Sequence, residues 1–177
     1  MILDNVSSWC INYVTIQHKD RSKIDSILEE LEEDCCALFN SIIPVPDECG
    51  VYSQFGFRDP NETEAAWGTR WDAEISYSAS IDDNTVCIEF YTTAPPTILY
   101  EYMEYCGYVV EAYYKISCGH DLEANYNKSG CGFCGKWHNG KCEYYEYNMT
   151  DLESRQLIPE DIFEYADLYR VQQQQED

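Results

Sequence analysis

Alternating and helical apolar patterns follow one another in a fixed order along the first 117 residues, and this order constrains the fold most. β-Branched and aromatic residues over 9–17 predict a strand. Over 22–38 the apolar residues recur at helical spacing, which predicts one amphipathic helix with a dense acidic outer face. Ser22-x-x-Asp25 favours a capping box at its start. Alternation resumes over 71–79 and 86–90, which indicates a hairpin.

A second helix and a fourth strand complete this pattern. Pro95 and Pro96 open a helix that runs to about Cys106 and ends at Gly107. Residues 108–116 alternate again. The order strand, helix, strand, strand, helix, strand is the split βαβ arrangement of ferredoxin-like folds, an antiparallel sheet with two helices on one face.

Two stretches depart from this pattern. Prolines and glycines punctuate residues 40–69, which we interpret as a loop insertion with little regular structure. Near the other end, Asn139-Gly140 lies between two alternating segments and is a strong signal for an added hairpin. Pro159 then begins a final short helix.

The expected organisation is one extended domain. Residues 1–117 form the core with its insertion, and residues 118–170 add a cysteine-containing loop, the hairpin and an acidic helical segment. Residues 171–177 form a disordered tail. The fold class is therefore α+β, a ferredoxin-like split βαβ unit plus an added C-terminal hairpin and short helix.

The chain is strongly acidic, with 33 Asp and Glu against 11 Lys and Arg and a net charge of −22. Such a field repels nucleic acid, anionic membranes and acidic substrates, and it attracts basic surfaces. Many of the 16 tyrosines lie beside carboxylates, as over 100–105 and 143–147. Tyrosine is favoured where a surface meets a partner. The alternative is that the acidity only solvates the surface and that strands simply favour tyrosine.

Four short motifs carry a resemblance to a known family. They are Trp-Cys-Ile-Asn at 9–12, Trp-Gly-Thr-Arg-Trp-Asp-Ala at 67–73, Phe-Tyr-Thr-Thr-Ala-Pro-Pro at 90–96 and Phe-Cys-Gly at 133–135. Over about residues 9–147 the chain resembles the YubB-type ferredoxin-like family of small phage- and plasmid-encoded proteins. The resemblance implies a domain encoded by a mobile element, with no established enzymatic activity. The chain departs from the family pattern in its acidity and its C-terminal additions.

Charge and resemblance together predict a partner. We expect a host protein with a basic surface, such as a nucleic-acid-binding defence complex, which the acidic surface would bind and inhibit by mimicking nucleic acid. Duplex DNA presents one negative charge per ~1.7 Å of its axis, and dense carboxylates can offer similar charge. The candidate partner-binding residues lie on the first helix, the second helix and the C-terminal stretch: Glu29, Glu30, Glu32, Glu33, Asp34, Glu101, Glu104, Glu143, Tyr144, Glu146, Asp151, Glu153, Glu160, Asp161 and Glu164.

The cysteines suggest one alternative, a zinc-stabilised scaffold or assembly protein whose acidity is only solubilising. Cys131-x-x-Cys134 has the spacing of half a tetrahedral zinc site. Cys118 and His120 could complete it, with His138 and Cys142 as substitutes. Four protein ligands would leave no open position for catalysis. Otherwise we expect no cofactor.

No motif indicates an enzyme. The sequence has no Gly-rich phosphate loop, Ser-centred elbow or Walker pattern, so we expect no catalytic residues. The acidic strands also argue against direct nucleic-acid binding. Residues 1–8 lack the features of a signal peptide, and no apolar run reaches the ~20 residues of a membrane span. We expect a cytoplasmic protein, in the host cytoplasm if a phage encodes it.

Overall fold

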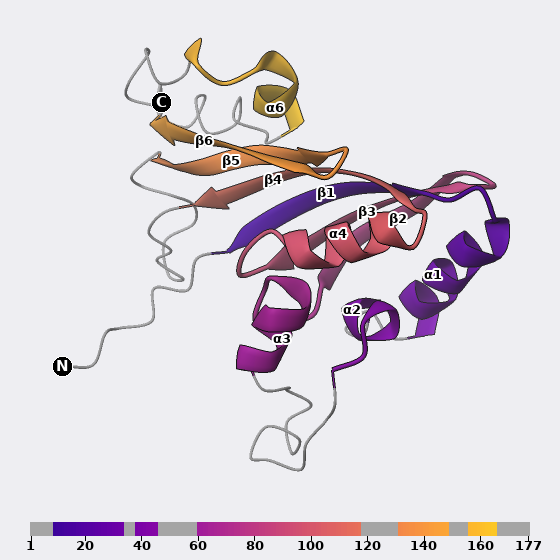
Figure 1. Cartoon of the computed structure of the whole chain (residues 1–177). Helices are drawn as coiled ribbons and strands as arrows, with labels where there is room; N and C mark the ends of the chain where they lie inside the picture. Colours follow the sequence, from indigo (N-terminus) through magenta and orange to yellow (C-terminus); the bar gives the residue numbers. More distant parts are fainter. Residues whose placement is uncertain (1–8, 34–37, 46–59, 118–130, 149–155, 166–177) are drawn as a thin grey trace.

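The computed structural model describes residues 9–33, 38–45, 60–117, 131–148 and 156–165. These residues form an α+β structure around one open sheet of six strands, in which every neighbouring pair is antiparallel (Figure 1). The order across the sheet is β2-β3-β1-β4-β5-β6. The strands are β1 (Cys10–Gln17), β2 (Glu74–Asp82), β3 (Thr85–Thr92), β4 (Val109–Ser117), β5 (Cys131–His138) and β6 (Lys141–Asn148).

The helices divide between the two faces of this sheet. The first four gather on one side, and the last lies on the other side, against β4 and β5 (Figure 1). They are α1 (Arg21–Glu33), α2 (Leu38–Ile42), α3 (Pro60–Trp67), α4 (Thr97–Tyr105) and α6 (Glu160–Tyr165). Among the described helices, none is both long and apolar enough to cross a membrane.

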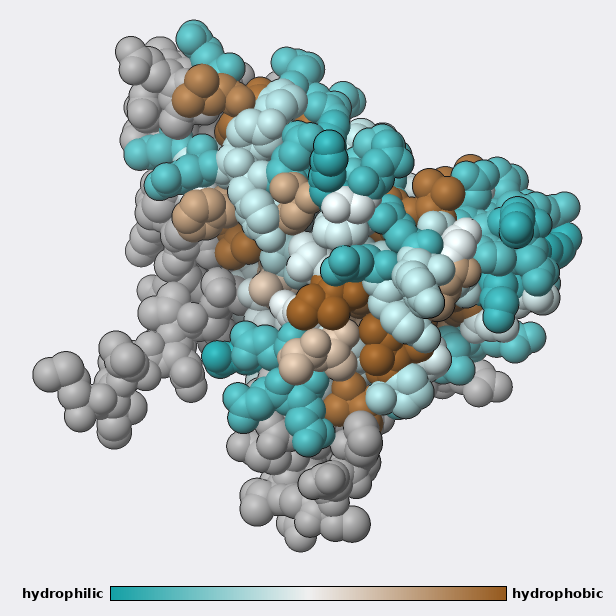
Figure 2. Space-filling view, in the orientation of Figure 1, coloured by the Kyte–Doolittle hydropathy of each residue, from teal (hydrophilic) through white to brown (hydrophobic). Residues whose placement is uncertain are grey.

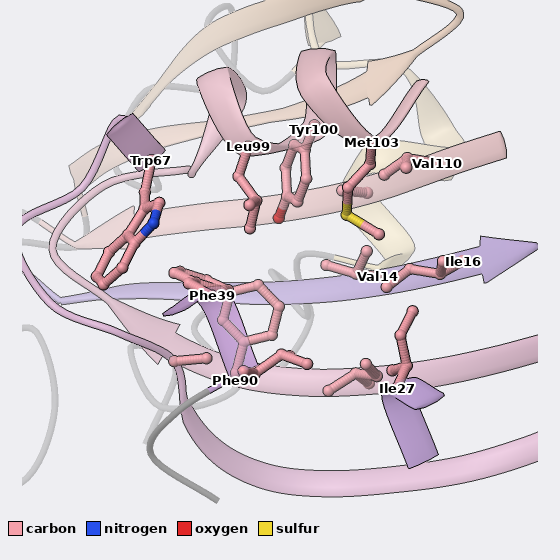
Figure 3. Packing of buried hydrophobic residues seen from close by; sticks show 14 of the residues in the cluster. Val14, Ile16, Ile27, Phe39, Trp67, Phe90, Leu99, Tyr100, Met103 and Val110 are labelled. Atoms are coloured by element: carbon pink, nitrogen blue, oxygen red, sulfur yellow. The ribbon is translucent and has the colours of Figure 1, made fainter. Parts of the chain in front are cut away.

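The main core lies between the sheet and α1–α4. Alternate residues of β1 and β3, such as Val14 and Phe90, are fully buried in one cluster with Ile27 of α1, Phe39 of α2 and Leu99 of α4 (Figure 3). Burying each such side chain contributes about 1.5–3 kcal/mol to folding. Strand alternation and the apolar sides of α1 and α4 contribute to this core as the sequence predicted, and Phe39 of α2 and Trp67 of α3 add to it.

A second, smaller core lies on the opposite face. Ile162 and Phe163 of α6 pack with Ile158 against Cys134 of β5 and Tyr147 of β6. Helix α6 therefore packs on the side of the sheet opposite α1–α4. It carries its acidic residues to that side.

The prediction of little regular structure over 40–69 is wrong in two places. Helix α2 extends to Ile42, and α3 occupies Pro60–Trp67. The α2 helix depends on a distant residue, because the Asp72 carboxylate accepts hydrogen bonds from the backbone N–H groups of Phe39 (2.7 Å) and Asn40 (3.0 Å). The α3 helix begins at Pro60, and its Trp67 ring donates to the carbonyl of Ile43 (2.9 Å). Residues 46–59 lie outside the described residues.

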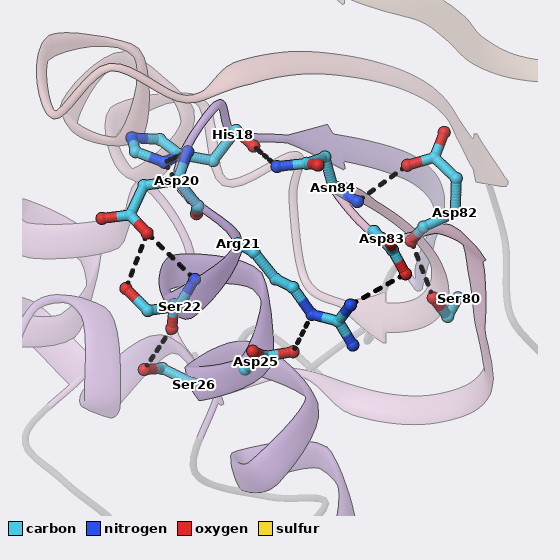
Figure 4. Close-up of polar contacts among 10 residues, drawn as sticks. All are labelled: His18, Asp20, Arg21, Ser22, Asp25, Ser26, Ser80, Asp82, Asp83 and Asn84. Atoms are coloured by element: carbon cyan, nitrogen blue, oxygen red, sulfur yellow. Dashed lines mark hydrogen bonds and ion pairs between the residues drawn. The ribbon is translucent and has the colours of Figure 1, made fainter.

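The start of α1 also differs from its prediction. Asp20, not Ser22, caps the helix, since its Oδ1 accepts from the Ser22 N–H (3.1 Å) and hydroxyl (2.9 Å). Arg21 pairs with Asp25 and reaches Asp83 in the β2–β3 turn (2.9 Å), as Figure 4 shows. The helix ends at Glu33 among the described residues, which omit 34–37.

Strands β5 and β6 pair antiparallel and are joined by the predicted Asn139-Gly140 turn. Asn139 and Gly140 have φ of 51° and 70°, as a two-residue hairpin turn requires. Helix α6 begins directly after Pro159, as predicted. The expected loop over 118–130 and the tail over 171–177 lie outside the described residues.

Candidate partner-binding face

The sheet face opposite α1–α4, which we call the outer face, carries a row of aromatic and acidic side chains. The strand register aligns Tyr77 of β2 with Glu89 of β3, Glu89 with Tyr13 of β1, and Tyr13 with Tyr113 of β4. Neighbouring strands lie about 4.8 Å apart, so each member of the row is within side-chain reach of the next. Tyr77 is 57% exposed at the edge of the sheet.

A β-bulge produces this row. The predicted alternation over 71–79 would turn Ile75 and Tyr77 to the same face, but a register shift between them separates them. Ile75 pairs with Phe90 and packs against the main core, whereas Tyr77 pairs with Glu89 on the outer face. Ser76, the extra residue, donates its hydroxyl to the Glu89 carboxylate (2.6 Å) and so holds it in place.

Beside the row, residues of β4, β5, β6 and α6 form a group of carboxylates held by hydroxyl and ammonium donors. The Tyr113 hydroxyl lies 3.4 Å from Glu111 and 3.4 Å from Asp161. Lys136 donates to Asp161 (2.7 Å). The Tyr145 hydroxyl donates to Glu143 (3.1 Å). We call Glu111, Glu143, Asp161 and these tyrosines, together with the exposed Glu164 of α6, the α6 acidic surface.

The ionisation of these groups follows from their contacts. Burial, then the nearby Glu111 and Asp161 carboxylates, raises the pKa of Tyr113 well above its usual range. Burial and the hydrogen bond to Glu143 raise the pKa of Tyr145. The hydrogen bond from Lys136 lowers the pKa of Asp161. At neutral pH the phenols are therefore neutral donors, and they fix carboxylates without cancelling their charge.

The structure brings only part of the predicted acidic set together. Glu143, Asp161 and Glu164 belong to the α6 acidic surface, and Glu160 is exposed on α6. The others lie elsewhere. The α1 residues Glu29, Glu30, Glu32 and Glu33 and the α4 residues Glu101 and Glu104 lie on the helix side, and Asp34, Asp151 and Glu153 lie outside the described residues.

Two residues of β6 face away from the outer face. Tyr144 and Glu146 pair with Gly135 and Phe133, on the side of the sheet opposite Tyr145. The Tyr144 ring lies 5.4 Å from that of Tyr114 on the helix side. Adjacent residues in a strand point to opposite faces, so the Glu-Tyr-Tyr-Glu-Tyr run is divided between the two sides.

The helix side has a different character. Hydrophobic residues gather near the middle of the surface shown in Figure 2, around α4, with hydrophilic residues around them. Ile98, Tyr102 and Tyr105 are 41%, 42% and 89% exposed along one side of α4. Glu104 does not face solvent freely, since its carboxylate accepts from the Trp137 ring N–H (3.2 Å).

The sequence missed Tyr13, Tyr77, Glu89, Glu111 and Tyr113 as members of one surface. Their period-two spacing was visible along each strand, but the register that aligns them across four strands was not. The bulge at Ser76 also reversed the face expected for Tyr77 relative to Ile75.

The described residues do not assemble a zinc site. Cys131 and Cys134 both lie in β5, where positions three apart are about 10 Å apart along the strand. His138 lies a further four residues along, and Cys142 pairs with Trp137 and so faces the side opposite Cys134. Within the described ranges, no three His, Cys, Asp or Glu could share a metal ion. Cys118 and His120 lie outside these ranges, so the zinc site stays a prediction.

Among the described cysteines, Cys10 and Cys134 are buried. Burial raises the pKa of Cys134 to about 12, and it raises the pKa of Cys10 further. The thiolate is the reactive form of cysteine, and both groups are thiols at neutral pH. Neither residue is therefore an activated nucleophile.

We compared the chain with models of protein families, with curated proteins and with solved structures, and found no significant match. The resemblance carried by the four motifs remains a prediction from the sequence.

Proposed function

We propose that this chain is a non-enzymatic accessory protein that binds and inhibits a host protein through its acidic, tyrosine-rich outer face. The partner has a basic surface that ordinarily holds nucleic acid, as in a nucleic-acid-handling defence complex. The observation that carries the proposal is the set of carboxylates on the α6 acidic surface that hydroxyl and ammonium donors hold in place.

Fixed carboxylates suit a surface that replaces nucleic acid. A phosphate backbone offers closely spaced negative charges at set positions to a basic groove. The Tyr145 hydroxyl restricts Glu143, the Tyr113 hydroxyl donates to Glu111 or Asp161, and Lys136 restricts Asp161 before binding, so less side-chain entropy is lost on association. The phenol rings add apolar contact area beside each charge.

We also propose that the chain is a YubB-type protein with a ferredoxin-like core. The strand order β2-β3-β1-β4, with α1 following β1 and α4 following β3, is consistent with a ferredoxin-like split βαβ core. The β5–β6 hairpin and α6 would then be additions, and α6 contributes to the proposed binding surface. A YubB-type protein of a phage or plasmid would act in the cytoplasm of its host.

The test is capture of host proteins on the immobilised full chain at about 50 mM and 500 mM NaCl. We expect basic, nucleic-acid-binding partners at low salt, their release at high salt, and competition by added DNA or RNA. Recovery of the same proteins at both salt concentrations, without competition by nucleic acid, would contradict the proposal.

A matched pair of variants makes the test specific to a surface. Glu111→Gln, Glu143→Gln and Glu164→Gln together remove three charges from the α6 acidic surface. Glu29→Gln, Glu30→Gln and Glu32→Gln remove three charges from α1 on the other side of the sheet. We expect the first variant to lose the partners and the second to keep them. Equal loss in both would mean that net charge alone attracts the captured proteins.

A further inference from the structure

Helix α6 packs against β4 and β5, and the other end of the outer face lies over β2, β3 and β1. These three strands contain no lysine or arginine. Their outer face presents Tyr77, Glu89 and Tyr13 as one cross-strand row, which we call the Tyr–Glu row. Two residues along β3, Tyr91 pairs with Glu74 and makes an edge contact with Trp9 (6.4 Å between ring centroids).

This arrangement has the chemistry that recognises a planar cation. A cation bound to Glu89 would have an aromatic ring on each side, since adjacent strands are about 4.8 Å apart and cation–π attraction acts within about 6 Å of a ring centroid. The Ser76 hydroxyl already fixes the Glu89 carboxylate (2.6 Å). Arginine suits such a site better than lysine, because its guanidinium both stacks on rings and pairs with a carboxylate through two N–H groups.

We propose that the Tyr–Glu row binds arginine side chains of an extended basic segment of the protein partner. The inference rests on the proposed function and names the chemistry that part of the partner must have. Charge complementarity selects this occupant. Nucleic acid or a second copy of this acidic chain would bring like charge to Glu74 and Glu89.

The geometry also indicates the spacing of the arginines. Glu89 and Tyr91 are two residues apart on β3, about 6.7 Å along the strand, and Glu74 lies beside Tyr91. Alternate residues of an extended peptide are separated by the same distance. A segment with arginine at every second position can therefore place one guanidinium at Glu89 and the next near Glu74.

The test uses a fluorescein-labelled peptide of four Arg-Ser repeats, and a Lys-Ser peptide of equal charge, in anisotropy titrations at low salt. We expect the arginine peptide to bind more tightly. Tyr77→Ala and Glu89→Gln should each weaken its binding about two- to fivefold, the loss of roughly 0.5–1 kcal/mol of contact. Tyr77→Phe should retain binding, because the ring and not the hydroxyl faces the cation.

Matched controls lie on α4, on the other side of the sheet. Tyr105→Ala removes a ring that is 89% exposed, and Glu101→Gln removes one exposed carboxylate. Both should leave the affinity within about twofold of wild type. Circular dichroism establishes that each variant is folded.

Several results would overturn the inference. They are no binding of the arginine peptide, equal weakening by the α4 controls, equal affinity for the lysine peptide, or a Tyr77-dependent binding of single-stranded RNA or self-association instead. Failure of this inference can be distinguished from failure of the proposed function. If the α6 triple variant loses the captured partners while Tyr77→Ala and Glu89→Gln retain them, only this inference is contradicted.

Discussion

The rings of Tyr113 in β4 and Tyr165 in α6 stack with their centroids 4.2 Å apart and their planes 10° from parallel. With buried Ile162 and Phe163, this contact attaches α6 to the outer face. The position of Asp161 beside the Tyr113 hydroxyl and Lys136 follows from that attachment.

Tyr165→Ala should loosen α6. Loss of the stacked ring is expected to lower the free energy of unfolding by about 0.5–1.5 kcal/mol, measured by urea denaturation. Glu164→Ala, in the neighbouring exposed position, serves as the control and should change stability by less. If the two substitutions have equal effects, the stacking contributes nothing of its own.

The Lys136–Asp161 pair predicts a pH dependence. The folded pKa of Asp161 lies below its unfolded value of about 3.9, so the pair stabilises the fold above that pH. Its contribution disappears as pH falls through the unfolded value toward the folded one. Asp161→Asn should therefore lower the melting temperature at pH 7 and have little effect near pH 2. A difference from wild type that is the same at both pH values would contradict this.

Gly135 is predicted to tolerate no side chain. A Cβ at this position would collide with the carbonyl oxygen of Glu143 and with the Tyr114 hydroxyl. Gly135→Ala should destabilise the hairpin by about 1–3 kcal/mol or more, as overpacking does in well-packed interiors. Thermal denaturation measures it, with Phe133→Ala as a control at a 41% exposed position of the same strand. An unchanged melting temperature in Gly135→Ala would show that β5 and β6 do not approach so closely.

Asn12 organises a polar group inside the main core. Its Nδ2 donates to the Thr92 hydroxyl (2.9 Å) and the Cys10 carbonyl (3.2 Å), and its Oδ1 lies 3.4 Å from the Tyr100 hydroxyl. Asn12→Leu removes the hydrogen bonds that Asn12 makes with the buried Thr92 and Tyr100 hydroxyls. It should lower the free energy of unfolding by about 1–3 kcal/mol.

A double-mutant cycle isolates that cost. Tyr100→Phe removes the hydroxyl that faces Asn12, so the pair Asn12→Leu and Tyr100→Phe should be more stable than the sum of the two single effects predicts. Strict additivity in urea denaturation would indicate that the two residues do not interact.

The sequence predicted where helices and strands form better than how they contact one another. Periodicity located the strands and the two longer helices, and Asn139-Gly140 located the hairpin turn. It could not show that Asp72 holds the start of α2 from 33 residues away, or that Trp67 of α3 bonds to the carbonyl of Ile43, because both contacts join residues that are distant in the sequence. Helices α2 and α3 depend on these contacts and were missed.

The sequence predicted the residue types of the candidate surface, but only some of the residues that form it. Acid beside tyrosine is a property of neighbouring residues, which the sequence displays. Whether Glu29 and Glu164 share a face depends on which side of the sheet each helix packs, and α1 and α6 pack on opposite sides. Runs of acidic residues therefore overestimated the extent of one continuous surface.

The most direct test of the proposed function compares the dissociation constants of a captured basic partner for the two triple variants at about 50 mM NaCl. We expect at least about threefold weaker binding for Glu111→Gln, Glu143→Gln and Glu164→Gln, since each exposed charge pair contributes about 0.2–1 kcal/mol. We expect little change for Glu29→Gln, Glu30→Gln and Glu32→Gln. Equal weakening, or weakening confined to the α1 variant, would contradict the proposed function.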